Sequence, residues 1–297
     1  MLKQHFNRMR ILIIGAGGML GHKTAEKLSA DFSVWTTVKG GLDGYKNFKI
    51  FDPKKTFENV NVQRVKQIRE IIIKVKPDVT INAVGIIKQL PALNNVVQTL
   101  NVNSIFPHVL AELTDEFASR LITFSTDCVF RGDRGNYTEE DAPDALDLYG
   151  RSKNFGEIYG GDCLTLRTSI IGRELLTKHS LVEWFLSNRG KKVKGFKNAV
   201  FSGFPTVVTA EIIADLITNH KNLKGLYHLS AEPISKFDLL GLLKKAYKTD
   251  VEIEPDENFV IDRSLDSAKF RMATNFKPKN WDEMVEEMAR DNSLYES

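Results

Sequence analysis

The 297-residue chain has few cysteines, no clustered histidines and no long apolar run near its N-terminus. Its two cysteines, Cys128 and Cys163, are too few for a disulfide framework, which favours a reducing compartment and predicts a cytoplasmic protein. The six histidines show no paired ligand spacing, so we expect no metal site. The apolar run at residues 11–14 is too short for a signal peptide or a membrane span, and we expect no membrane attachment.

Neither sign of charge dominates. The chain has 41 lysines and arginines against 38 acidic residues, and the net charge of +3 is too small to indicate a nucleic acid partner. This weak positive balance is compatible with an anionic small substrate. The sequence also lacks internal repeats and low-complexity linkers, so we expect its two halves to fold against each other.

The first half alternates strand-like and helix-like segments, which predicts a parallel sheet covered on both faces. The expected strands are residues 10–14, 33–38, 48–51, 79–82 and 120–125, and the expected helices are 19–30, 62–75, 93–117 and 148–160. The second half is less regular. Its expected strands are 163–168, 199–203 and 226–229, and its expected helices are 181–188, 207–219, 235–247 and one after residue 281.

A glycine-rich turn follows the first expected strand. Gly15, Gly18 and Gly21 form a G-x-x-G-x-x-G pattern that opens the first helix. In such a turn the glycines permit the tight bend, the approach of a pyrophosphate and close packing of helix on strand. The amides at the helix N-terminus, which include those of Met19 and Leu20, suit the phosphate charge. The turn therefore predicts a dinucleotide site.

The fold class that follows is α/β, with a Rossmann-type doubly wound parallel sheet and a smaller α/β substrate-binding domain. We expect residues 1–166, joined by roughly 199–222, to form the NAD(P)-binding domain. The remainder, 167–297, is expected to be mainly the substrate-binding domain.

The end of the second strand indicates which cofactor binds. An acid there would bind the adenosine ribose of NAD, whereas a basic residue suits the 2′-phosphate of NADP. This strand ends without an acid and is followed by Lys39, so NADP(H) is favoured over NAD(H). We expect Asp52, at the end of the third expected strand, to accept a hydrogen bond from the adenine amino group or to cap a helix. Ala83, Val84 and Gly85, after the fourth strand, are also assigned to the cofactor.

A tyrosine and a lysine at helical spacing suggest the chemistry. Tyr149 and Lys153 are four residues apart, so they share one helix face. A lysine ammonium beside a tyrosine hydroxyl favours the phenolate and makes the phenol a better acid near neutral pH. Thr126, at the end of a strand, is our candidate for binding a substrate carbonyl, with Ser125 as its more buried neighbour. Together with a bound nicotinamide, these side chains predict ketone reduction, with Tyr149 as the general acid. Lys153 is also expected to bind the nicotinamide ribose.

Several blocks resemble the dTDP-4-dehydrorhamnose reductase family of extended short-chain dehydrogenases/reductases. Residues 125–130 read S-T-D-C-V-F where the family has S-T-D-Y-V-F, and residues 148–153 read L-Y-G-R-S-K where it has Y-G-x-S-K. The resemblance implies NADPH-dependent reduction of a nucleotide-linked 4-keto-6-deoxy sugar, for surface polysaccharide or deoxysugar biosynthesis. It implies Thr126, Tyr149 and Lys153 as the catalytic triad. Asn103 falls where the superfamily often keeps an asparagine near the proton path, although an ordinary polar helix residue is an equal interpretation.

Departures from the family pattern concern the substrate. Cys128 replaces an aromatic residue that helps to shape the sugar pocket, which leaves the identity of the sugar open. Ser125, Asp127 and Cys128 are candidates for contacts with the sugar. The diphosphate needs cations, and Arg173 and Arg263 are our candidates, because an arginine fork suits paired phosphate oxygens.

Two other functions remain open at this stage. A nucleotide-sugar epimerase would keep its cofactor tightly bound and return the hydride to the sugar. A non-catalytic NADP-binding regulatory subunit is the second alternative, because the regulatory subunit of methionine adenosyltransferase resembles the same family. The oligomeric state is not fixed by the sequence, which is compatible with a homodimer.

Overall fold

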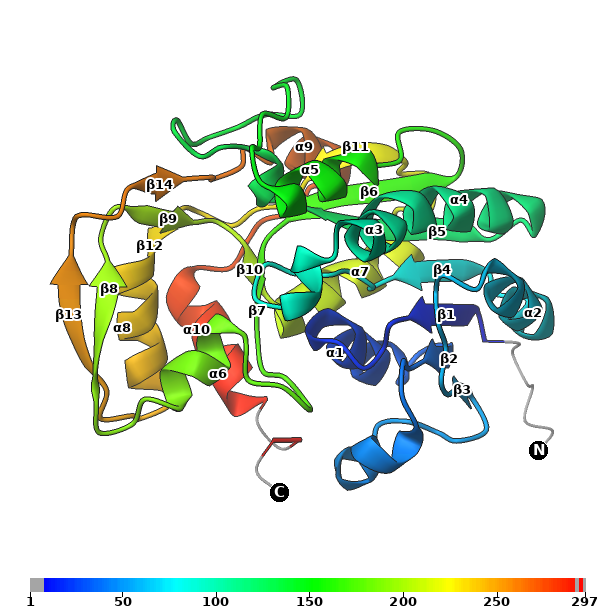
Figure 1. Ribbon diagram of the computed structural model, residues 1–297, viewed down its shortest axis with the longest axis horizontal. Helices are drawn as coiled ribbons and strands as arrows, with labels where there is room; N and C mark the ends of the chain where they lie inside the picture. The colour runs from blue at the N-terminus through cyan, green and yellow to red at the C-terminus, as the bar shows by residue number, and fades with distance from the viewer. Residues whose placement is uncertain (1–7, 292–293, 296–297) are drawn as a thin grey trace.

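The computed structural model describes residues 8–291, 294 and 295, and a seven-stranded parallel sheet lies at its centre (Figure 1). Every neighbouring pair in this sheet is parallel. The strands, in order across the sheet, are β11 (Gly225–His228), β6 (Cys163–Thr168), β5 (Arg120–Thr126), β4 (Val79–Asn82), β1 (Arg10–Ile14), β2 (Ser33–Thr37) and β3 (Thr56–Phe57). This order confirms the expected Rossmann-type fold.

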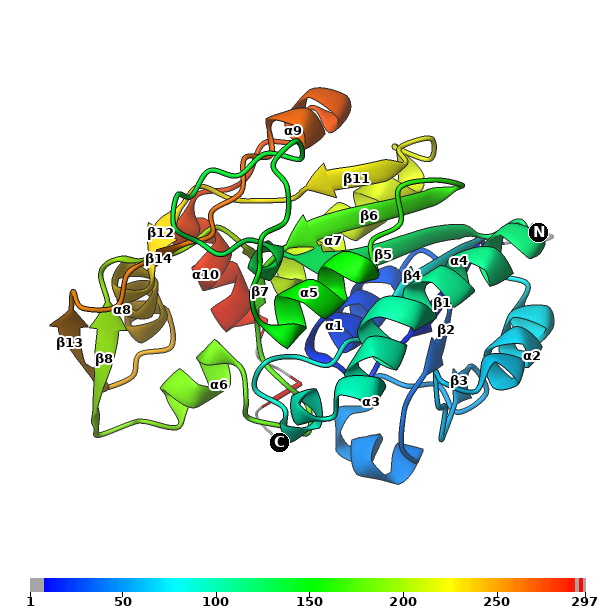
Figure 2. The ribbon, with the colours of Figure 1, turned by 45° about the horizontal axis from the view of Figure 1, so that its top comes forward.

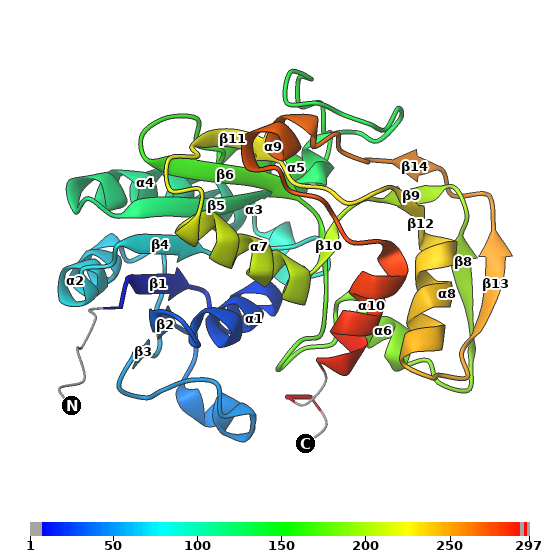
Figure 3. The same cartoon turned by 180° about the vertical axis from the view of Figure 1, so that it is seen from behind.

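Helices cover both faces of the sheet. In the view from behind, α1 (Met19–Leu28) and α7 (Thr206–Thr218) lie against one face (Figure 3). Against the other face pack α2 (Val65–Val75) and α4 (Phe106–Glu116). One hydrophobic core lies on each face of the sheet. Alternate side chains of β1 enter these two cores, which explains why the strand is apolar from Ile11 to Ile14. None of the described helices is long and apolar enough to cross a membrane.

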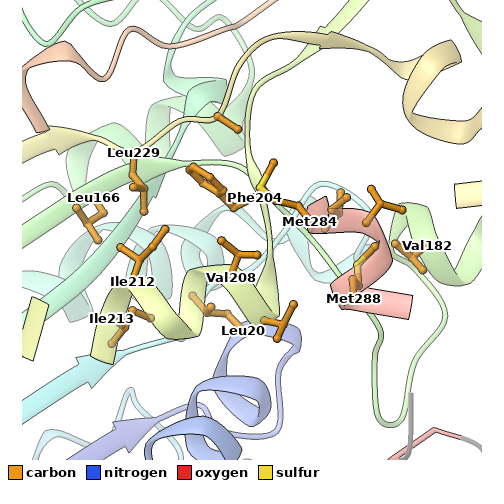
Figure 4. Close-up of a cluster of buried hydrophobic side chains, with 14 of the residues drawn as sticks. Leu20, Leu166, Val182, Phe204, Val208, Ile212, Ile213, Leu229, Met284 and Met288 are labelled. Carbon is orange, nitrogen blue, oxygen red and sulfur yellow. The ribbon is translucent and has the colours of Figure 1, made fainter. Parts of the chain in front are cut away.

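The larger core continues beyond the sheet. Phe204, Val208 and Ile212 pack near Met284 of α10 (Trp281–Arg290), and Val182 of α6 (Leu181–Leu186) completes the far side of this cluster (Figure 4). The second half of the chain therefore shares a hydrophobic core with the first half.

A smaller α/β region lies beyond the carboxyl ends of the parallel strands (Figures 1 and 2). Its helices are α8 (Lys236–Ala246) and α9 (Ala268–Thr274), together with α6 and α10. Its short strands pair as β7 (Ile170–Ile171) with β10 (Phe204–Pro205), β8 (Lys192–Phe196) with β13 (Glu252–Asp256), and β9 (Ala199–Phe201) between β12 (Ile234–Ser235) and β14 (Ile261–Asp262). These pairings join residues far apart in the sequence, and strands of two residues have no hydrophobic periodicity. The sequence therefore did not indicate most of the strands in this region.

The prediction of a third strand at 48–51 is wrong. A 3₁₀ segment, η1 (Leu42–Phe48), occupies most of the connection after β2, and the third strand is the two-residue β3. Asp52 therefore does not end a strand. Its carboxylate accepts a hydrogen bond from the Lys54 amide at 2.9 Å, within a turn.

The expected helix at 93–117 is divided. A 3₁₀ turn, η2 (Pro91–Asn94), and the short α3 (Val96–Leu100) precede a π-helical segment, η3 (Asn101–Ile105), and α4 follows. Pro107 has no amide hydrogen to donate to the carbonyl of Asn103, so the regular hydrogen-bond ladder cannot continue there. The helix α5 (Leu148–Phe155) is also shorter than expected, because Gly156 follows its last residue.

Candidate active site

The glycine turn has the geometry that a dinucleotide requires. Gly15 has a φ of +88°, and its amide donates to Thr37 Oγ1 at 3.1 Å. A side chain at Gly21 would collide with the carbonyl oxygen of Gly15. Helix α1 begins after this turn with no capping side chain and no acid in its first turn. Its N-terminal amides therefore fit an anion such as a dinucleotide pyrophosphate.

Substitution of Gly21 tests this turn. Gly21→Ala is expected to weaken NADPH binding at least tenfold, because the methyl group must push the Gly15 carbonyl away from the phosphate site. Gly241→Ala in α8 is the matched control, since open space surrounds Gly241. That control should leave binding unchanged and raise stability by about 0.5–1 kcal/mol. NADPH fluorescence measures the loss of binding, and thermal unfolding measures the change in stability separately. Equal NADPH affinities for the two variants would contradict the assignment of the glycine turn to the cofactor.

The loop after β4 lies beside the glycine turn. The amide of Ala83 donates to the Ile14 carbonyl at 2.9 Å, and Val84 Cγ2 lies 2.7 Å from the position that a Cβ of Gly15 would take. Asn103 holds the next part of this loop, because its side chain accepts from the Ile86 amide at 2.8 Å and donates to the Ile86 carbonyl at 2.9 Å. The structure thus places Ala83 and Val84 against the glycine turn, and Asn103 holds the part of the loop that follows them.

The adenosine end of the site differs from the sequence interpretation. Lys39 is exposed and lies two residues after Thr37, whose carbonyl accepts from the Ala16 amide of the turn at 2.9 Å. Asp52 lies elsewhere: it lines a surface depression together with Ser33 and Val34, at the beginning of β2. The loss of its strand-end position removes the reason for assigning it to adenine.

Sequence reasoning missed Tyr45 and Glu58. A Cβ on Gly17 would collide with the Tyr45 hydroxyl, so Tyr45 rests on the glycine turn. Glu58 follows β3 and accepts a hydrogen bond from the Leu42 amide at 2.8 Å. Neither position was detectable in the sequence, because the 3₁₀ segment that places Tyr45 has no hydrophobic period.

Thr126 and Tyr149 meet at the carboxyl end of β5. Thr126 is the last residue of β5 and caps the short η4 (Asp127–Val129), where its hydroxyl accepts from the Cys128 amide at 3.1 Å. Tyr149 is in the first turn of α5, and its phenol is within hydrogen-bonding reach of the Thr126 hydroxyl. The structure therefore brings together the two hydroxyls that the sequence assigned to a substrate carbonyl.

The electrostatics of Tyr149 differ from the expectation. Burial raises the pKa of its phenol, as do the Cys128 thiol and the nearby carboxylates, while the bond to Thr126 opposes them. Lys153 Nζ donates to the Phe124 carbonyl at 2.6 Å, and burial lowers the pKa of Lys153 to about 8. The main influences on the pKa of Tyr149 are therefore burial and Cys128, and not Lys153 as the four-residue spacing predicted. At neutral pH the phenol carries its proton.

The neighbours of Thr126 have separate roles. Ser125 does not face the substrate side freely, because its hydroxyl donates to Glu157 Oε1 at 2.6 Å. Asp127 is buried beside Thr126, and burial raises the pKa of its carboxyl group. Cys128 is next to it, and burial raises the pKa of its thiol to about 12, so the thiol stays protonated.

Three cations surround Asp127 and Cys128. Arg263 Nε donates to the Phe130 carbonyl at 2.7 Å, and its Nη1 is 4.0 Å from Cys128 Sγ. Lys88 Nζ lies 5.8 Å from the centre of the Tyr149 ring and 2.6 Å from Asp147 Oδ2. Lys236, the first residue of α8, is half-buried within electrostatic range of both Asp127 and Arg263. The sequence analysis identified Arg263 but missed both lysines.

Arg173 is part of a different contact network. Its Nε donates to Glu183 Oε1 at 2.5 Å, and its guanidinium lies 4.7 Å from the centre of the Tyr295 ring. These contacts tie it to α6 and the C-terminal residues, so we do not retain it as a substrate-binding candidate. Among the described residues, no group of three His, Cys, Asp or Glu side chains is arranged to hold a metal ion.

The family model described as RmlD substrate binding domain matches residues 9–293 of the chain. The chain belongs to this family. The match covers both the parallel sheet and the smaller region, and it confirms the resemblance drawn from the motifs around Thr126 and Tyr149.

Individual relatives agree with this family. A dTDP-4-dehydrorhamnose reductase from Aggregatibacter actinomycetemcomitans is 28% identical over 298 residues, covering 92% of this chain and 95% of that protein. The crystal structure of a Bacillus anthracis dTDP-4-dehydrorhamnose reductase in complex with NADP superimposes with a TM-score of 0.79 at 20% identity, covering 96% and 99% of the two chains, and it supports the fold. Methionine adenosyltransferase 2 subunit beta from Mus musculus is 32% identical over 153 residues, covering 50% of this chain and 41% of that protein.

Proposed function

We propose that this RmlD-family protein is an NADPH-dependent reductase of a nucleotide-linked 4-keto-6-deoxy sugar, acting in the cytoplasm in deoxysugar or surface polysaccharide biosynthesis. The single observation that carries the proposal is the meeting of the Thr126 and Tyr149 hydroxyls at the carboxyl end of β5. In parallel α/β sheets, ligands bind at this edge. We assign the sheet and its helices to cofactor binding and the smaller region mainly to the substrate.

Ketone reduction needs a hydride and a proton, and a side chain of this protein can supply the proton. The bound nicotinamide supplies the hydride. Tyr149 holds its proton at neutral pH, because burial keeps the phenol neutral, and it donates this proton to the developing alkoxide. The Thr126 hydroxyl donates to Asp127 Oδ1 at 3.1 Å in this structure, and in the reaction it would turn this hydrogen towards the same substrate oxygen as its charge grows. Lys153 shares a face of α5 with Tyr149 and donates to the Phe124 carbonyl, and we assign it to stabilising the phenolate that remains.

The cations around Asp127 suit the substrate's diphosphate. Arg263 retains guanidinium hydrogens beyond the one that binds the Phe130 carbonyl. In the described part of the chain, Lys236 has no hydrogen bond or ion pair, although it is half-buried between other charges. An amine in that position is expected to have an anionic ligand, since burial of an unpaired charge is unfavourable. We propose Lys236, Lys88 and Arg263 as the groups that bind the diphosphate.

A lysine substitution distinguishes binding from chemistry. Lys236→Met keeps the length of the side chain and removes its charge, so the KM for the sugar nucleotide is expected to rise about tenfold, with kcat changed much less. Lys244→Met, at the other end of the same helix, is the matched control and should leave both constants unaltered. Steady-state kinetics measure KM and kcat for both variants. An unchanged KM for Lys236→Met would refute the assignment of Lys236 to the substrate's diphosphate.

The cofactor preference rests on the end of β2. No acid follows this strand, and Lys39 is exposed there, which suits a 2′-phosphate. Glu58 is close by, but its carboxylate already binds the Leu42 amide. The test compares the affinities for NADPH and NADH of the unaltered protein with those of Lys39→Ala. If Lys39 binds the 2′-phosphate, Lys39→Ala weakens the binding of NADPH and leaves that of NADH unchanged.

A panel of keto-sugar nucleotides assayed by the absorbance of NADPH tests the function as a whole. The proposal predicts consumption of NADPH with at least one 4-keto sugar nucleotide. Tight retention of NAD, with sugar epimerisation and no NADPH consumption, would favour the epimerase instead.

A non-catalytic binding subunit is the second candidate function. The match to methionine adenosyltransferase 2 subunit beta over half of the chain favours it. The joint presence of Thr126, Tyr149 and Lys153 argues for catalysis. Stable association with a partner enzyme, without turnover of any keto-sugar nucleotide, would favour the subunit.

A further inference from the structure

A fully buried ion pair lies next to the candidate catalytic residues. The side chains of Glu157 and Arg167 are 0% and 1% exposed. Arg167 Nε and Nη2 donate to the two carboxylate oxygens of Glu157 at 2.7 and 2.8 Å. The Ser125 hydroxyl adds a bond to Oε1 at 2.6 Å, and the Tyr159 hydroxyl adds one to Oε2 at 2.8 Å. Each carboxylate oxygen thus accepts two hydrogen bonds, which offset the cost of burying this group.

The sheet fixes the other side of this pair. Arg167 of β6 is in register with Ser125 of β5 and with His228 of β11. Its Nη1 lies 3.2 Å from His228 Nε2, and His228 Nδ1 lies 3.0 Å from the Tyr137 carbonyl. Burial and the neighbouring guanidinium lower the pKa of His228 to about 4, so the imidazole is neutral and Arg167 is the cation of this cluster.

Glu157 is connected to the catalytic residues in two ways. It follows Lys153 by four residues, just after the end of α5, and it is the charge that opposes the effect of burial on the pKa of Lys153. Lys153 Nζ binds the carbonyl of Phe124, while Glu157 binds the hydroxyl of the next residue, Ser125. Two adjacent residues of β5 are therefore held in place, Phe124 by Lys153 of α5 and Ser125 by Glu157, which lies two residues beyond this helix. Thr126 is the next residue in the chain.

We propose that Glu157 is a positioning residue for the reduction, which fixes the end of β5 through Ser125 and acts electrostatically on the Lys153 ammonium from four residues further along the chain. The link to catalysis rests on the proposed function, whereas the effect on Lys153 does not. The other titratable or charged groups around the Tyr149–Lys153 pair are Asp127 and Cys128 after β5, Asp147 at the start of α5, and Lys88 from the loop after β4. They adjoin Tyr149 and remain unchanged when Glu157 is replaced.

The test is a titration of Lys153 itself. The full-length protein is labelled with ¹³C at lysine Cε, and the Lys153 signal is assigned by its loss in Lys153→Arg. Glu157→Gln is expected to move the titration midpoint to lower pH by about 1 unit, because an opposite charge at short range shifts a pKa by that order. The variant Glu157→Gln/Arg167→Met removes both buried charges and should show a shift in the same direction. Asp256→Asn removes another buried, ion-paired carboxylate, in β13, and should match the unaltered protein.

The catalytic consequence has its own readout. The alkaline limb of the kcat–pH profile should move with the NMR midpoint in the Glu157 variants and stay in place in Asp256→Asn. An unchanged Lys153 midpoint in folded Glu157→Gln would overturn the proposal, and if this variant does not fold, an unchanged midpoint in the double variant would do so. If the unaltered protein reduces no keto sugar, the proposed function fails, while the NMR midpoint still decides the effect on Lys153.

Discussion

Tyr149→Phe is expected to lower the turnover of a keto-sugar nucleotide by about 10²–10⁴-fold, the usual contribution of a positioned general acid. Phenylalanine keeps the ring in the first turn of α5 and removes only the hydroxyl that reaches Thr126. The affinity for NADPH should stay close to that of the unaltered protein, because the ring does not form part of the glycine turn. Single-turnover oxidation of NADPH measures this loss without interference from product release.

A matched tyrosine gives the control for that experiment. Tyr227→Phe removes a hydroxyl from a tyrosine in β11 that packs against Lys269 and Phe270, away from Thr126. This control should keep the original rate. A rate in Tyr149→Phe within a few-fold of the control would contradict the role of Tyr149 as the proton donor.

Lys153→Ala is expected to reduce both the rate and the cofactor affinity, each by about tenfold or more, since hydrogen bonds from charged groups contribute ~1.5–3 kcal/mol. The change removes the ammonium that donates to the Phe124 carbonyl and that we assign to the nicotinamide ribose. Kinetics and NADPH titration of the same preparation measure the two losses separately. A rise in KM with an unchanged kcat would show that Lys153 contributes binding alone.

The pH dependence follows from the same lysine. Burial lowers the pKa of Lys153 to about 8, so the ammonium is present below this pH and is lost above it. The rate of the unaltered protein should therefore fall as the pH rises through about 8. Lys153→Ala should lack this alkaline limb, which distinguishes the titration of Lys153 from that of Tyr149, whose raised pKa places its deprotonation at higher pH.

Much of the parallel sheet was predictable because its signals are local. Apolar runs such as Ile11–Ile14 and Val79–Ile81 precede turn residues, and every strand of this sheet except β3 was located to within a residue at each end. The connection after β2 was not predictable, because glycines and a 3₁₀ turn replace any periodic pattern there. In the expected helix at 93–117, Pro107 is a local sign of the interruption, whereas the hold of Asn103 on Ile86 is a tertiary contact that the sequence does not show.

In the candidate site, too, local sequence signals indicate some residues and tertiary contacts bring in the others. The motifs that hold Gly15, Thr126 and Tyr149 in place are short, and the sequence located all three at one edge of the sheet. Lys236 and Arg167 reach the site from distant segments, so no local spacing indicates them. The electrostatic interpretation of Tyr149 failed for a related reason: helical spacing places a lysine near a tyrosine, whereas burial depends on the whole fold.

Transfer of isotope from the cofactor tests the central claim most directly. NADPH carrying deuterium at the transferable C4 position is incubated with the protein and a nucleotide-linked 4-keto-6-deoxy sugar, and the product is analysed by NMR and mass spectrometry. The account predicts one deuterium on the new carbinol carbon, in equal amount to the NADPH consumed, and its loss in Tyr149→Phe. Unchanged NADPH across the sugar panel, or a product formed without deuterium, would contradict it.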